Sequence, residues 1–539
     1  MNFFLSNLLL LLILGDMMDP IDMMVADHNC EYLGLSRLCL MENAGKSISD
    51  EVATLATFKF SYPVKILIFT GSGGNGGDGF VAARHLLNRG FEVEVYALNS
   101  QAEIKSDDAL ANLNILLNMA PRVSRLSVNF IKDSSDLDNL KIDSNDSYII
   151  LDCLLGTGIK GKLRSKVRRA VELMNELKGI RVAIDVPSGL NPLTGEISDI
   201  AVAADYTVCF HKVKTGVRIA GEEDVGGIIT CDIGIPLEAE LYVEGGDMLR
   251  FKNRSPDSHK GNNGRVLIVG GSKDFYGAPA IAGKAAIATG ADLIYIYSPK
   301  DAALAIKSIS EDFIVEEAKG DYLSMDDLDN ILELSKKADA VLLGPGSSQD
   351  EATAKLFNTL AFKLDKPLVV DADALKLIDF KLISNKEDLI ITPHLFEFKT
   401  FFKGVIGEKG IDLDKVVELS SEDNSNFKKV NEKIDALRSI TKSIKGSVIL
   451  KGQYDYIFNQ GKVKINRTGN AGMTAGGTGD ALAGICLSLL SQGLGPFDAA
   501  ILAPYFNGKA GDLAKEEMGY GFGAEDLTHY LAVFMKDLN

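Results

Sequence analysis

Residues 470–484 read NAGMTAGGTGDALAG, a glycine-rich turn that runs directly into an apolar segment with helical spacing. A glycine-rich loop that opens a helix presents unpaired backbone N–H groups at the positive end of the helix dipole, which makes it a natural cradle for phosphate. Asp480 needs an explanation there, because a carboxylate repels a phosphate. This stretch alone leaves two interpretations open. Asp480 is a general base, or it is the N-cap residue and stabilises the helix by about 1 kcal/mol.

The composition bounds the classes of protein to which the chain can belong. Its 539 residues are too many for one hydrophobic core and predict about two or three domains. The hydrophobic fraction of 46% and the charged fraction of 24% are ordinary for a globular protein, and the net charge of −17 argues against a nucleic-acid partner. The 52 glycines cluster in short loops after apolar runs, which is typical of an α/β protein with nucleotide-binding turns.

The cysteines, the histidines and the first residues bear on compartment and metal chemistry. The six cysteines include no CxxC pair, which favours a reduced, cytoplasmic setting, and the six histidines lack the spacing of a zinc site. Residues 3–14 are almost wholly apolar but too short to span a bilayer as a helix. We interpret residues 1–21 as an extension that results from an upstream start codon; a signal peptide or membrane anchor is the alternative.

A strand, a glycine-rich loop and a helix follow one another near residue 70. The apolar run 64–69 predicts a buried parallel strand, residues 70–79 read TGSGGNGGDG, and residues 80–87 have helical character. This order is that of a phosphate-binding βα unit, without the Gly-Lys-Ser/Thr ending of a Walker A loop. Asn75 and Asp78 either face a ligand or cation, or merely cap the turn.

Two further predicted strands in the first half end in aspartate-containing loops. Residues 148–153 include Asp152 and precede a Gly-Thr-Gly turn, and residues 181–185 end in Asp185 before a Val-Pro-Ser-Gly turn. Ligands bind beyond the carboxyl ends of the strands in an open parallel sheet, so we expect these loops and the loop 70–79 to converge on one crevice. Residues 27–45 predict a helix, a turn and a second helix that serve packing.

These blocks resemble the YjeF N-terminal domain, the family of NAD(P)H-hydrate epimerases. The resemblance covers about residues 22–241 and rests on the segments 29–31, 40–45, 73–79, 152–158 and 185–190, in that order. It implies a Rossmann-like three-layer domain, with Asp185 as the acid/base and a potassium ion on Asn75, Asp152 and Ser188. The hydrate contacts that it implies are Gly74, Asn75, Gly76, Gly77, Asp78, Gly156, Thr157, Gly158, Ile159, Lys160, Gly161, Lys162 and Asp185. Gly74 stands where the family usually has asparagine.

A second α/β domain begins with the strand predicted at residues 265–269. An Ala-rich helix follows near residues 280–289, and four more short apolar strands each deliver polar residues at their carboxyl end. Those strands are predicted at 338–343, 367–371, 389–392 and 447–450. Loops gathered at one end of a sheet, with Asp480 among them, are typical of a nucleotide-dependent active site. His394 is either a structural residue of such a loop or a substrate contact.

This second half resembles the ribokinase superfamily and, within it, the ADP- or ATP-dependent NAD(P)H-hydrate dehydratases. The matching segments are 260–261, 270–272, 277–279, 344–346, 371–375, 392–397, 451–452 and 476–480. The resemblance implies a ribokinase-like α/β domain over 242–539, fused to the first domain as in the bifunctional enzymes. Implied hydrate contacts are Ala278, Gly346, His394, Leu395, Phe396, Glu397, Phe398, Lys399, Thr400 and Asp480. Implied nucleotide contacts are Lys451, Gly452, Gln453, Tyr454, Asp455, Asn470, Ala471, Gly472, Met473, Thr474, Ala475, Gly476, Gly477, Thr478 and Gly479. Leu395, Phe396 and Thr474 depart from the family, which commonly has Pro, Gly and Ala there.

Together the two resemblances imply a repair enzyme for hydrated NADH and NADPH (NADHX and NADPHX). In this hypothesis Asp480 takes the proton from the ring hydroxyl of the (S)-hydrate, which attacks the terminal phosphoryl group of ADP with Mg²⁺ present. AMP leaves, and loss of phosphate then regenerates the reduced nucleotide. The first domain interconverts the (R)- and (S)-hydrates. A homo-oligomer, a tetramer or larger, is implied, with no nucleic acid and no membrane. The alternatives are a small-molecule kinase of the same superfamily and a first domain that only binds its ligand.

Overall fold

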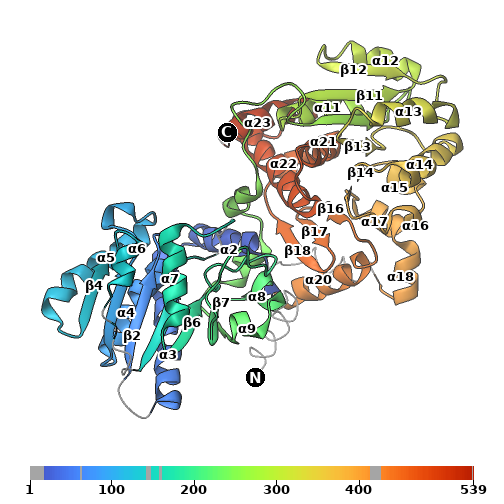
Figure 1. Ribbon diagram of the computed structural model, residues 1–539. Helices are drawn as coiled ribbons and strands as arrows, with labels where there is room; N and C mark the ends of the chain where they lie inside the picture. Colours follow the sequence, from blue (N-terminus) through green and yellow to red (C-terminus); the bar gives the residue numbers. More distant parts are fainter. Residues whose placement is uncertain are drawn as a thin grey trace. The chain divides into compact units, whose positions relative to one another are not determined.

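The computed structural model describes residues 17–60, 64–140, 142, 147–156, 161–412, 427–536 and 538, the segment 427–430 by its backbone alone. The chain divides into two compact units between Glu240 and Leu241 (Figure 1). Residues 17–21, which the sequence placed in an extension, form the strand β1 (Met17–Met18) and the start of the helix α2 (Pro20–Tyr32). Residues 1–16 lie outside the described part of the chain.

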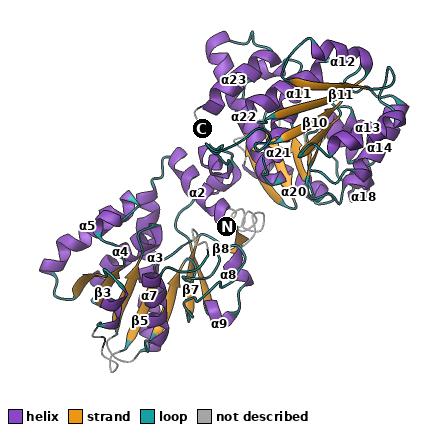
Figure 2. Cartoon of the chain, turned by 45° about the horizontal axis from the view of Figure 1, so that its top comes forward, coloured by secondary structure: helices purple, strands orange, loops and turns teal. Residues whose placement is uncertain are grey.

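The first unit is built on a seven-stranded sheet in which every pair of neighbouring strands is parallel (Figures 1 and 2). The strand order β4-β3-β2-β5-β6-β7-β9 places β2 and β5 near the centre, as expected of a Rossmann-like domain. The strands are β2 (Lys65–Thr70), β3 (Glu92–Ala97), β4 (Leu126–Phe130), β5 (Tyr148–Cys153), β6 (Ile180–Ile184), β7 (Tyr206–Phe210) and β9 (Gly227–Cys231).

Helices cover both faces of this sheet because alternate strand residues point to opposite sides. Ile66 and Ile68 join one buried apolar cluster, and Leu67 and Phe69 join another. The first cluster includes side chains of α2, α3 (Arg37–Lys59), α4 (Gly74–Asn88) and α5 (Asp107–Met119), and the second those of α6 (Ser134–Asp138) and α7 (Ser165–Glu176). The remaining short elements are β8 (Val213–Lys214), α8 (Thr215–Ile219), α9 (Glu222–Val225), α10 (Leu237–Leu241), η1 (Gln101–Glu103) and η2 (Ala120–Arg122).

The helix α4 begins at Gly74, six residues earlier than the sequence predicts, and takes most of the glycine-rich loop into its first turns. A Cβ atom on Gly76 would lie 2.2 Å from the carbonyl oxygen of Gly71, and one on Gly77 would lie 2.5 Å from the Met41 side chain. Glycine is therefore required there by the close approach of α4 to the preceding loop and to α3, besides any role in ligand binding.

The second unit contains a nine-stranded sheet of order β12-β11-β10-β13-β14-β15-β16-β17-β18. The strands from β12 to β16 are parallel, and β17 and β18 extend the sheet in antiparallel pairing. The predicted strands at 265–269 and 447–450 are confirmed to the residue. The strands are β10 (Arg265–Val269), β11 (Leu293–Ser298), β12 (Phe313–Glu317), β13 (Ala340–Leu343), β14 (Leu368–Val370), β15 (Leu389–Ile391), β16 (Ser447–Leu450), β17 (Asp455–Asn459) and β18 (Lys462–Asn466).

This sheet also lies between two helical layers, each with its own buried apolar cluster. One layer consists of α11 (Gly277–Ala288), α12 (Lys300–Lys307), α21 (Thr478–Ser491), α22 (Pro496–Met518) and α23 (Ala524–Lys536). The other consists of α13 (Leu328–Ser335), α14 (Glu351–Lys363), α15 (Ala374–Leu377), α16 (Phe380–Ile383), α17 (Leu395–Phe401), α18 (Lys403–Lys409) and α20 (Phe427–Thr441). The 3₁₀ turns are η3 (Gly245–Arg250), η4 (Met325–Asp327) and η5 (Ala471–Thr474).

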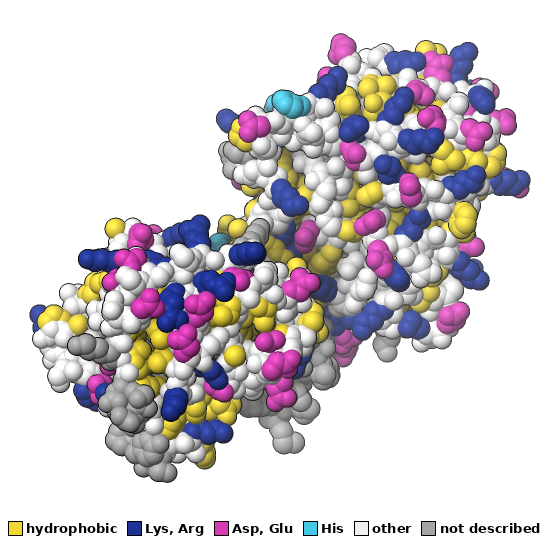
Figure 3. Space-filling view, in the orientation of Figure 1, with side chains coloured by type: hydrophobic (Ala, Val, Ile, Leu, Met, Phe, Trp, Pro, Cys, Tyr) yellow, Lys and Arg dark blue, Asp and Glu magenta, His cyan; other side chains and the backbone are white. Residues whose placement is uncertain are grey.

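The surface matches the acidic but mixed composition. On the face shown in Figure 3, Lys and Arg side chains are interspersed with Asp and Glu side chains and do not form one basic face. Within the described residues, none of the helices has both the length and the apolar character that a bilayer-crossing segment needs.

The strand β1 ties the start of the described chain to the interior of the first unit. Met18 is buried and pairs with Lys214 of β8, and the Thr215 hydroxyl donates to Asp19 Oδ1 at 2.6 Å. A chain that begins at Met23 should therefore be less stable than one that begins at Met17 by about 2–4 kcal/mol, from one lost buried side chain and one lost hydrogen bond. Thermal unfolding of the two chains measures this difference, and equal stability of the first unit would contradict it.

Candidate active sites

The first candidate site lies beyond the carboxyl ends of β2, β5 and β6, where the sequence places it. Asn75, in the first turn of α4, donates from Nδ2 to the carbonyl oxygens of Leu155 at 2.9 Å and Ile184 at 2.8 Å. Leu155 follows β5, and Ile184 ends β6. One side chain therefore joins the three loops, and its Oδ1 accepts no hydrogen bond from the described residues.

Asp152 and Ser188 form a buried pair beside Asn75. The Ser188 hydroxyl donates to Asp152 Oδ1 at 2.6 Å, and its backbone N–H donates to Oδ2 at 2.7 Å. Burial raises the pKa of Asp152 to about 6, although these hydrogen bonds and one from the Leu154 N–H oppose the rise. The carboxylate, amide and hydroxyl oxygens of these three side chains are of the kind that a hard cation prefers, so the residues fit the potassium ion that the resemblance implies.

Asp185 lies at the end of β6 in an unusual backbone conformation. Its φ of +66° is in the left-handed region, and its N–H donates to the Val208 carbonyl at 2.7 Å. The Lys214 ammonium forms a salt bridge with Asp185 Oδ1 and donates to the Phe210 carbonyl at 3.0 Å. Sequence reasoning missed Lys214. The signal was the pair of lysines in the segment VCFHKVKTG (208–216), since a lysine beside a buried strand needs a partner.

Two further carboxyl groups share this environment. Burial raises the pKa of Asp27 to about 7, the Lys214 ammonium opposes the rise, and the Asp185 carboxylate adds to it. Burial also raises the pKa of Asp78 well above its ordinary value, with Asp185 and Asp27 adding to the effect. Asp27 lies on α2, which the sequence assigned to packing only, so its place in the crevice was also missed.

The remaining predicted contacts of the first site are distributed differently. Gly156 lies beside Asn75, whose Cγ would be 3.7 Å from a Cβ on that glycine. Gly161 and Lys162 are exposed, as is Gly74, where a side chain would meet open space. Thr157, Gly158, Ile159 and Lys160 lie outside the described residues.

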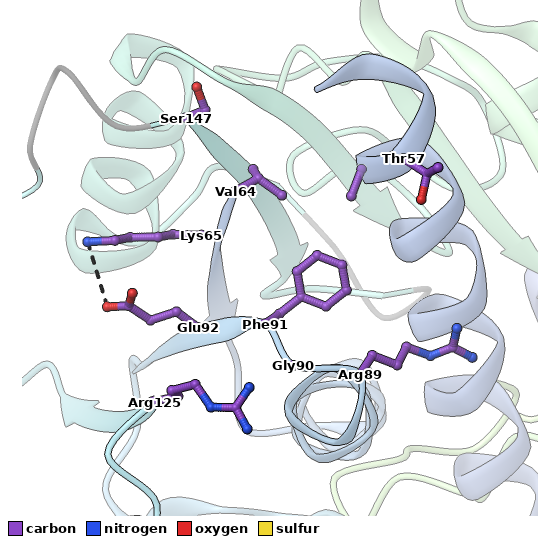
Figure 4. A pocket seen from close by; sticks show the side chains of 10 residues that line it. Thr57, Val64, Lys65, Arg89, Gly90, Phe91, Glu92, Arg125 and Ser147 are labelled. Atoms are coloured by element: carbon purple, nitrogen blue, oxygen red, sulfur yellow. Dashed lines mark ion pairs between the residues drawn. The ribbon is translucent and has the colours of Figure 1, made fainter. Parts of the chain in front are cut away.

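A cavity of about 510 Å³ opens elsewhere on the first unit (Figure 4). Lys65 and Glu92, whose charged groups are 3.6 Å apart, line it together with Phe91, Arg89 and Arg125. Lys65 and Glu92 are the first residues of β2 and β3, so the cavity is at the end of the sheet opposite to Asp152 and Asp185. It is therefore not part of the candidate site.

The second candidate site centres on Asp480, the third residue of α21. This helix begins at Thr478, and its N-cap residue is Gly477, with a φ of +95°. The interpretation of Asp480 as the N-cap residue is therefore wrong. The pKa of Asp480 is raised to about 7, chiefly by burial. The Asp371 carboxylate adds to this rise, and the Lys451 ammonium opposes it. A carboxyl group with such a pKa can exchange protons near neutrality.

Lys451 follows β16 and lies among three carboxyl groups, those of Asp371, Glu397 and Asp480. Its Nζ atom is 2.9 Å from Asp371 Oδ1, which also accepts from the Thr392 hydroxyl at 2.7 Å. Burial lowers the pKa of Lys451, but Asp371, Glu397 and Asp480 outweigh burial and raise it overall. A Cβ on Gly479 would lie 3.5 Å from Nζ, so the ammonium group lies against the first turn of α21.

His394 is the N-cap residue of α17, and its ring therefore has a structural role. Its Nδ1 accepts from the N–H groups of Phe396 at 3.1 Å and Glu397 at 3.3 Å, while Glu397 Oε2 accepts from the His394 N–H at 3.0 Å. The side chain remains 51% exposed, and its Nε2 lies 3.4 Å from Glu397 Oε1. Phe396 is exposed, whereas Phe398 is fully buried and packs against Phe402 at 4.6 Å between ring centroids.

The predicted nucleotide-binding segments are held in place by hydrogen bonds to α22 and β18. Asn470 donates from Nδ2 to the Gly511 carbonyl at 2.8 Å and to Asp512 Oδ1 at 3.0 Å, which anchors the glycine-rich loop on α22. Asp455 accepts from the Asn466 side chain at 3.0 Å and the Gly452 N–H at 3.2 Å, and this closes the turn after β16. Gly476 keeps open space around it, as a phosphate cradle requires.

The predicted hydrate contacts Ala278 and Gly346 adjoin each other. A Cβ on Gly346 would lie 3.2 Å from the Ala278 Cβ and 2.2 Å from the Phe275 carbonyl oxygen, and the φ of Gly346 is +64°. Glycine is thus required at 346 for close approach as well as conformation. Within the part of the chain that the structure describes, no set of three or more His, Cys, Asp or Glu side chains is spaced to hold a metal ion.

Two family models match the chain, one in each unit. The model described as NAD(P)H-hydrate dehydratase matches residues 266–532, and that of the YjeF-related protein N-terminus matches residues 37–216. The bifunctional NAD(P)H-hydrate repair enzyme of Methanothermobacter thermautotrophicus is 46% identical over 521 residues, which is 96% of this chain and 95% of that protein. Its counterpart in Methanocaldococcus jannaschii is 37% identical over 97% of this chain and 94% of that protein. A solved ADP/ATP-dependent NAD(P)H-hydrate dehydratase from Bacillus subtilis has a TM-score of 0.45 and 23% identity, and covers 56% of this chain and 99% of that chain.

Proposed function

The chain belongs to the family of bifunctional NAD(P)H-hydrate repair enzymes, and we propose from this that its two units repair hydrated NADH and NADPH in sequence. The first unit epimerises the (R)- and (S)-hydrates, and the second dehydrates the (S)-hydrate at the expense of ADP. One observation supports this above all: each unit places a carboxylate–lysine pair at the carboxyl edge of its own parallel sheet, Lys214 with Asp185 and Lys451 with Asp371.

In the second unit Asp480 accepts the proton of the ring hydroxyl. The hydroxyl oxygen forms a bond to the terminal phosphorus of ADP, and the bond between that phosphorus and AMP breaks. The N–H groups at the start of α21 and the Lys451 ammonium stabilise the negative charge of the transferred group. The ring nitrogen then expels phosphate from the carbon beside it, and loss of a proton from the next ring carbon gives NADH or NADPH. We place Mg²⁺ with the ADP phosphates, where it would offset their charge.

In the first unit Asp185 donates a proton to the hydroxyl group, which leaves one face of the ring as water, and takes a proton back as water adds to the other face. Asn75, Asp152 and Ser188 would hold a potassium ion, which supplies positive charge that keeps the three loops together. The fit rests on the free Asn75 Oδ1 and the buried Asp152 carboxylate. We further propose a cytoplasmic homo-oligomer, in keeping with the absence of CxxC pairs in the sequence.

Repair of a mixture of (R)- and (S)-NADHX, with ADP and ATP compared in parallel, tests this function. We expect the absorbance of reduced nicotinamide to return for both epimers with ADP. Recovery of the (S)-share alone, with the (R)-share lost only at the spontaneous rate, would show a first unit that binds without catalysis. Accumulation of a stable phosphorylated product would indicate a kinase, and no recovery with either nucleotide would refute the dehydratase assignment.

A further inference from the structure

We propose that Lys214 is a positioning residue for epimerisation, which holds one oxygen of the Asp185 carboxylate and leaves the other free for the substrate hydroxyl. This inference rests on the proposed epimerase function of the first unit. Lys214 is fully buried, so its ammonium group depends on protein partners for its hydrogen bonds. Those partners are Asp185 Oδ1 and the Phe210 carbonyl.

The Asp185 carboxylate is held asymmetrically. The Lys214 ammonium donates a hydrogen bond to Oδ1, and the Phe210 N–H donates to the same oxygen at 3.4 Å. Oδ2 has no hydrogen-bond donor among the described residues. The side chain of Asp185 keeps 12% of its surface exposed, whereas that of Lys214 keeps none. The ion pair therefore buries the ammonium behind the carboxylate and turns the carboxylate towards the crevice.

The backbone around this pair is fixed from several sides. The left-handed φ of Asp185 is unfavourable for a residue with a side chain, so it needs support from its surroundings. The Val208 carbonyl accepts from the Asp185 N–H, and the Cys209 thiol lies 3.5 Å from the Asp185 carbonyl. Lys214 itself is held by β8 against β1. Both partners of the ion pair are thus placed by the fold before a substrate binds.

The charges that face Asp185 come from four elements. Asp27 on α2 and Asp78 on α4 are acidic, and Lys214 of β8 is the cation that opposes the rise in their pKa. The fourth group is the Cys209 thiol of β7, whose pKa burial raises to about 12. Removal of this ammonium would leave Asp27 and Asp78 without the positive charge that opposes the rise in their pKa. The carboxyl groups around Asp185 would then ionise at higher pH.

Lys212, two residues before Lys214, provides a matched control. It is also buried, and it is paired with a carboxylate, Glu240 Oε2. Glu240 lies on α10 and also contacts His211 Nε2 at 2.8 Å. The two lysines therefore share burial, a salt bridge and a position in the chain, but the partner of Lys214 alone is the proposed acid/base.

The experiment compares Lys214→Met with Lys212→Met in the full chain, by (R)/(S) interconversion above the spontaneous rate across pH. Dehydration of pure (S)-hydrate in the same samples reports the amount of active protein. We expect Lys214→Met to lower kcat for epimerisation by about 10²-fold or more, to change KM little, and to move the acid limb of the profile to higher pH. Lys212→Met should keep the parent profile.

Three outcomes decide the matter. An unshifted profile with the parent kcat in Lys214→Met overturns the inference, while an inactive parent protein overturns the epimerase function itself. A shift of the same size in Lys212→Met also overturns the inference about Lys214, because a general loss of packing would then explain the effects of both variants. If Lys214→Met does not fold, Lys214→Ala is assayed with and without added ethylammonium; rescue supports the inference, and folded, inactive protein without rescue opposes it.

Discussion

Asp480→Asn is expected to reduce ADP-dependent dehydration by about 10²–10⁴-fold while (R)/(S) interconversion stays at the parent rate. An amide cannot accept the hydroxyl proton, yet it has the size of the carboxyl group and leaves the first turn of α21 unchanged. The helix needs no side-chain cap from residue 480, since Gly477 is its N-cap residue. Steady-state dehydration of pure (S)-hydrate gives the first rate, and epimerisation measured on the same preparation gives the second.

Asp373→Asn is the matched control for this variant. Asp373 belongs to the same acidic surroundings and adds to the pKa rise of Asp480, but its own carboxylate is bound by Lys376 at 3.2 Å and Gln349 at 3.2 Å. We expect Asp373→Asn to keep most of the activity and to move the acid limb of the dehydration profile slightly to lower pH, because one negative neighbour of Asp480 is gone. Dehydration by Asp480→Asn at the parent rate would rule out Asp480 as the base.

Lys451→Met is expected to destabilise the second unit by about 3 kcal/mol near neutral pH and to abolish dehydration. Asp371 is buried and would lose its cationic partner, while Asp480 and Glu397 would lose the ammonium that offsets their charge. The methionine retains the length of the aliphatic stem, so the loss reports charge and not volume. Calorimetry of the full chain should show one transition shifted and the transition of the first unit unchanged.

The sign of the pH dependence separates this mechanism from simple loss of packing. The pKa of Asp480 is raised from 3.8 to about 7 in the folded protein, so the folded state prefers the protonated form, and the stability that this group contributes is lost as pH rises through 7. Removal of Lys451 should raise this pKa further. The destabilisation should therefore be largest above about pH 7 and should diminish towards about pH 5. A pH-independent loss would mean that the ammonium does not offset these carboxyl groups.

Much of the architecture could be predicted because its signals are local. An apolar run that ends in glycine and aspartate marks a buried parallel strand, and the strands at 148–153 and 265–269 occur as expected. The positions of Asp152, Asp185, Asp371 and Lys451 follow from the same pattern, since carboxyl ends of parallel strands share one edge of the sheet.

The missed residues depend on tertiary contacts that leave no periodic trace. Lys214 belongs to a strand of two residues, which is too short to give an alternating pattern, and its depth depends on pairing with β1. Asp27 lies on the helix α2, and an acidic side chain on a helix ordinarily faces water. The capping role of His394 was hidden because histidine is not among the usual N-cap residues, although Glu397 stands at the position that completes a capping box.

The helix α10 determines where the gene can be divided without damage to either half. Ala239 accepts a hydrogen bond from Asn29, and Glu240 binds His211 and Lys212, so α10 is integral to the first unit. Tyr242 and Val243 already attach to Ile465 of the second unit. Leu241 follows Glu240 directly and is buried in an apolar cluster of the second unit. For expression as two separate polypeptides, the break must therefore fall at the peptide bond between Glu240 and Leu241, since a cut a few codons to either side removes an anchor from one product.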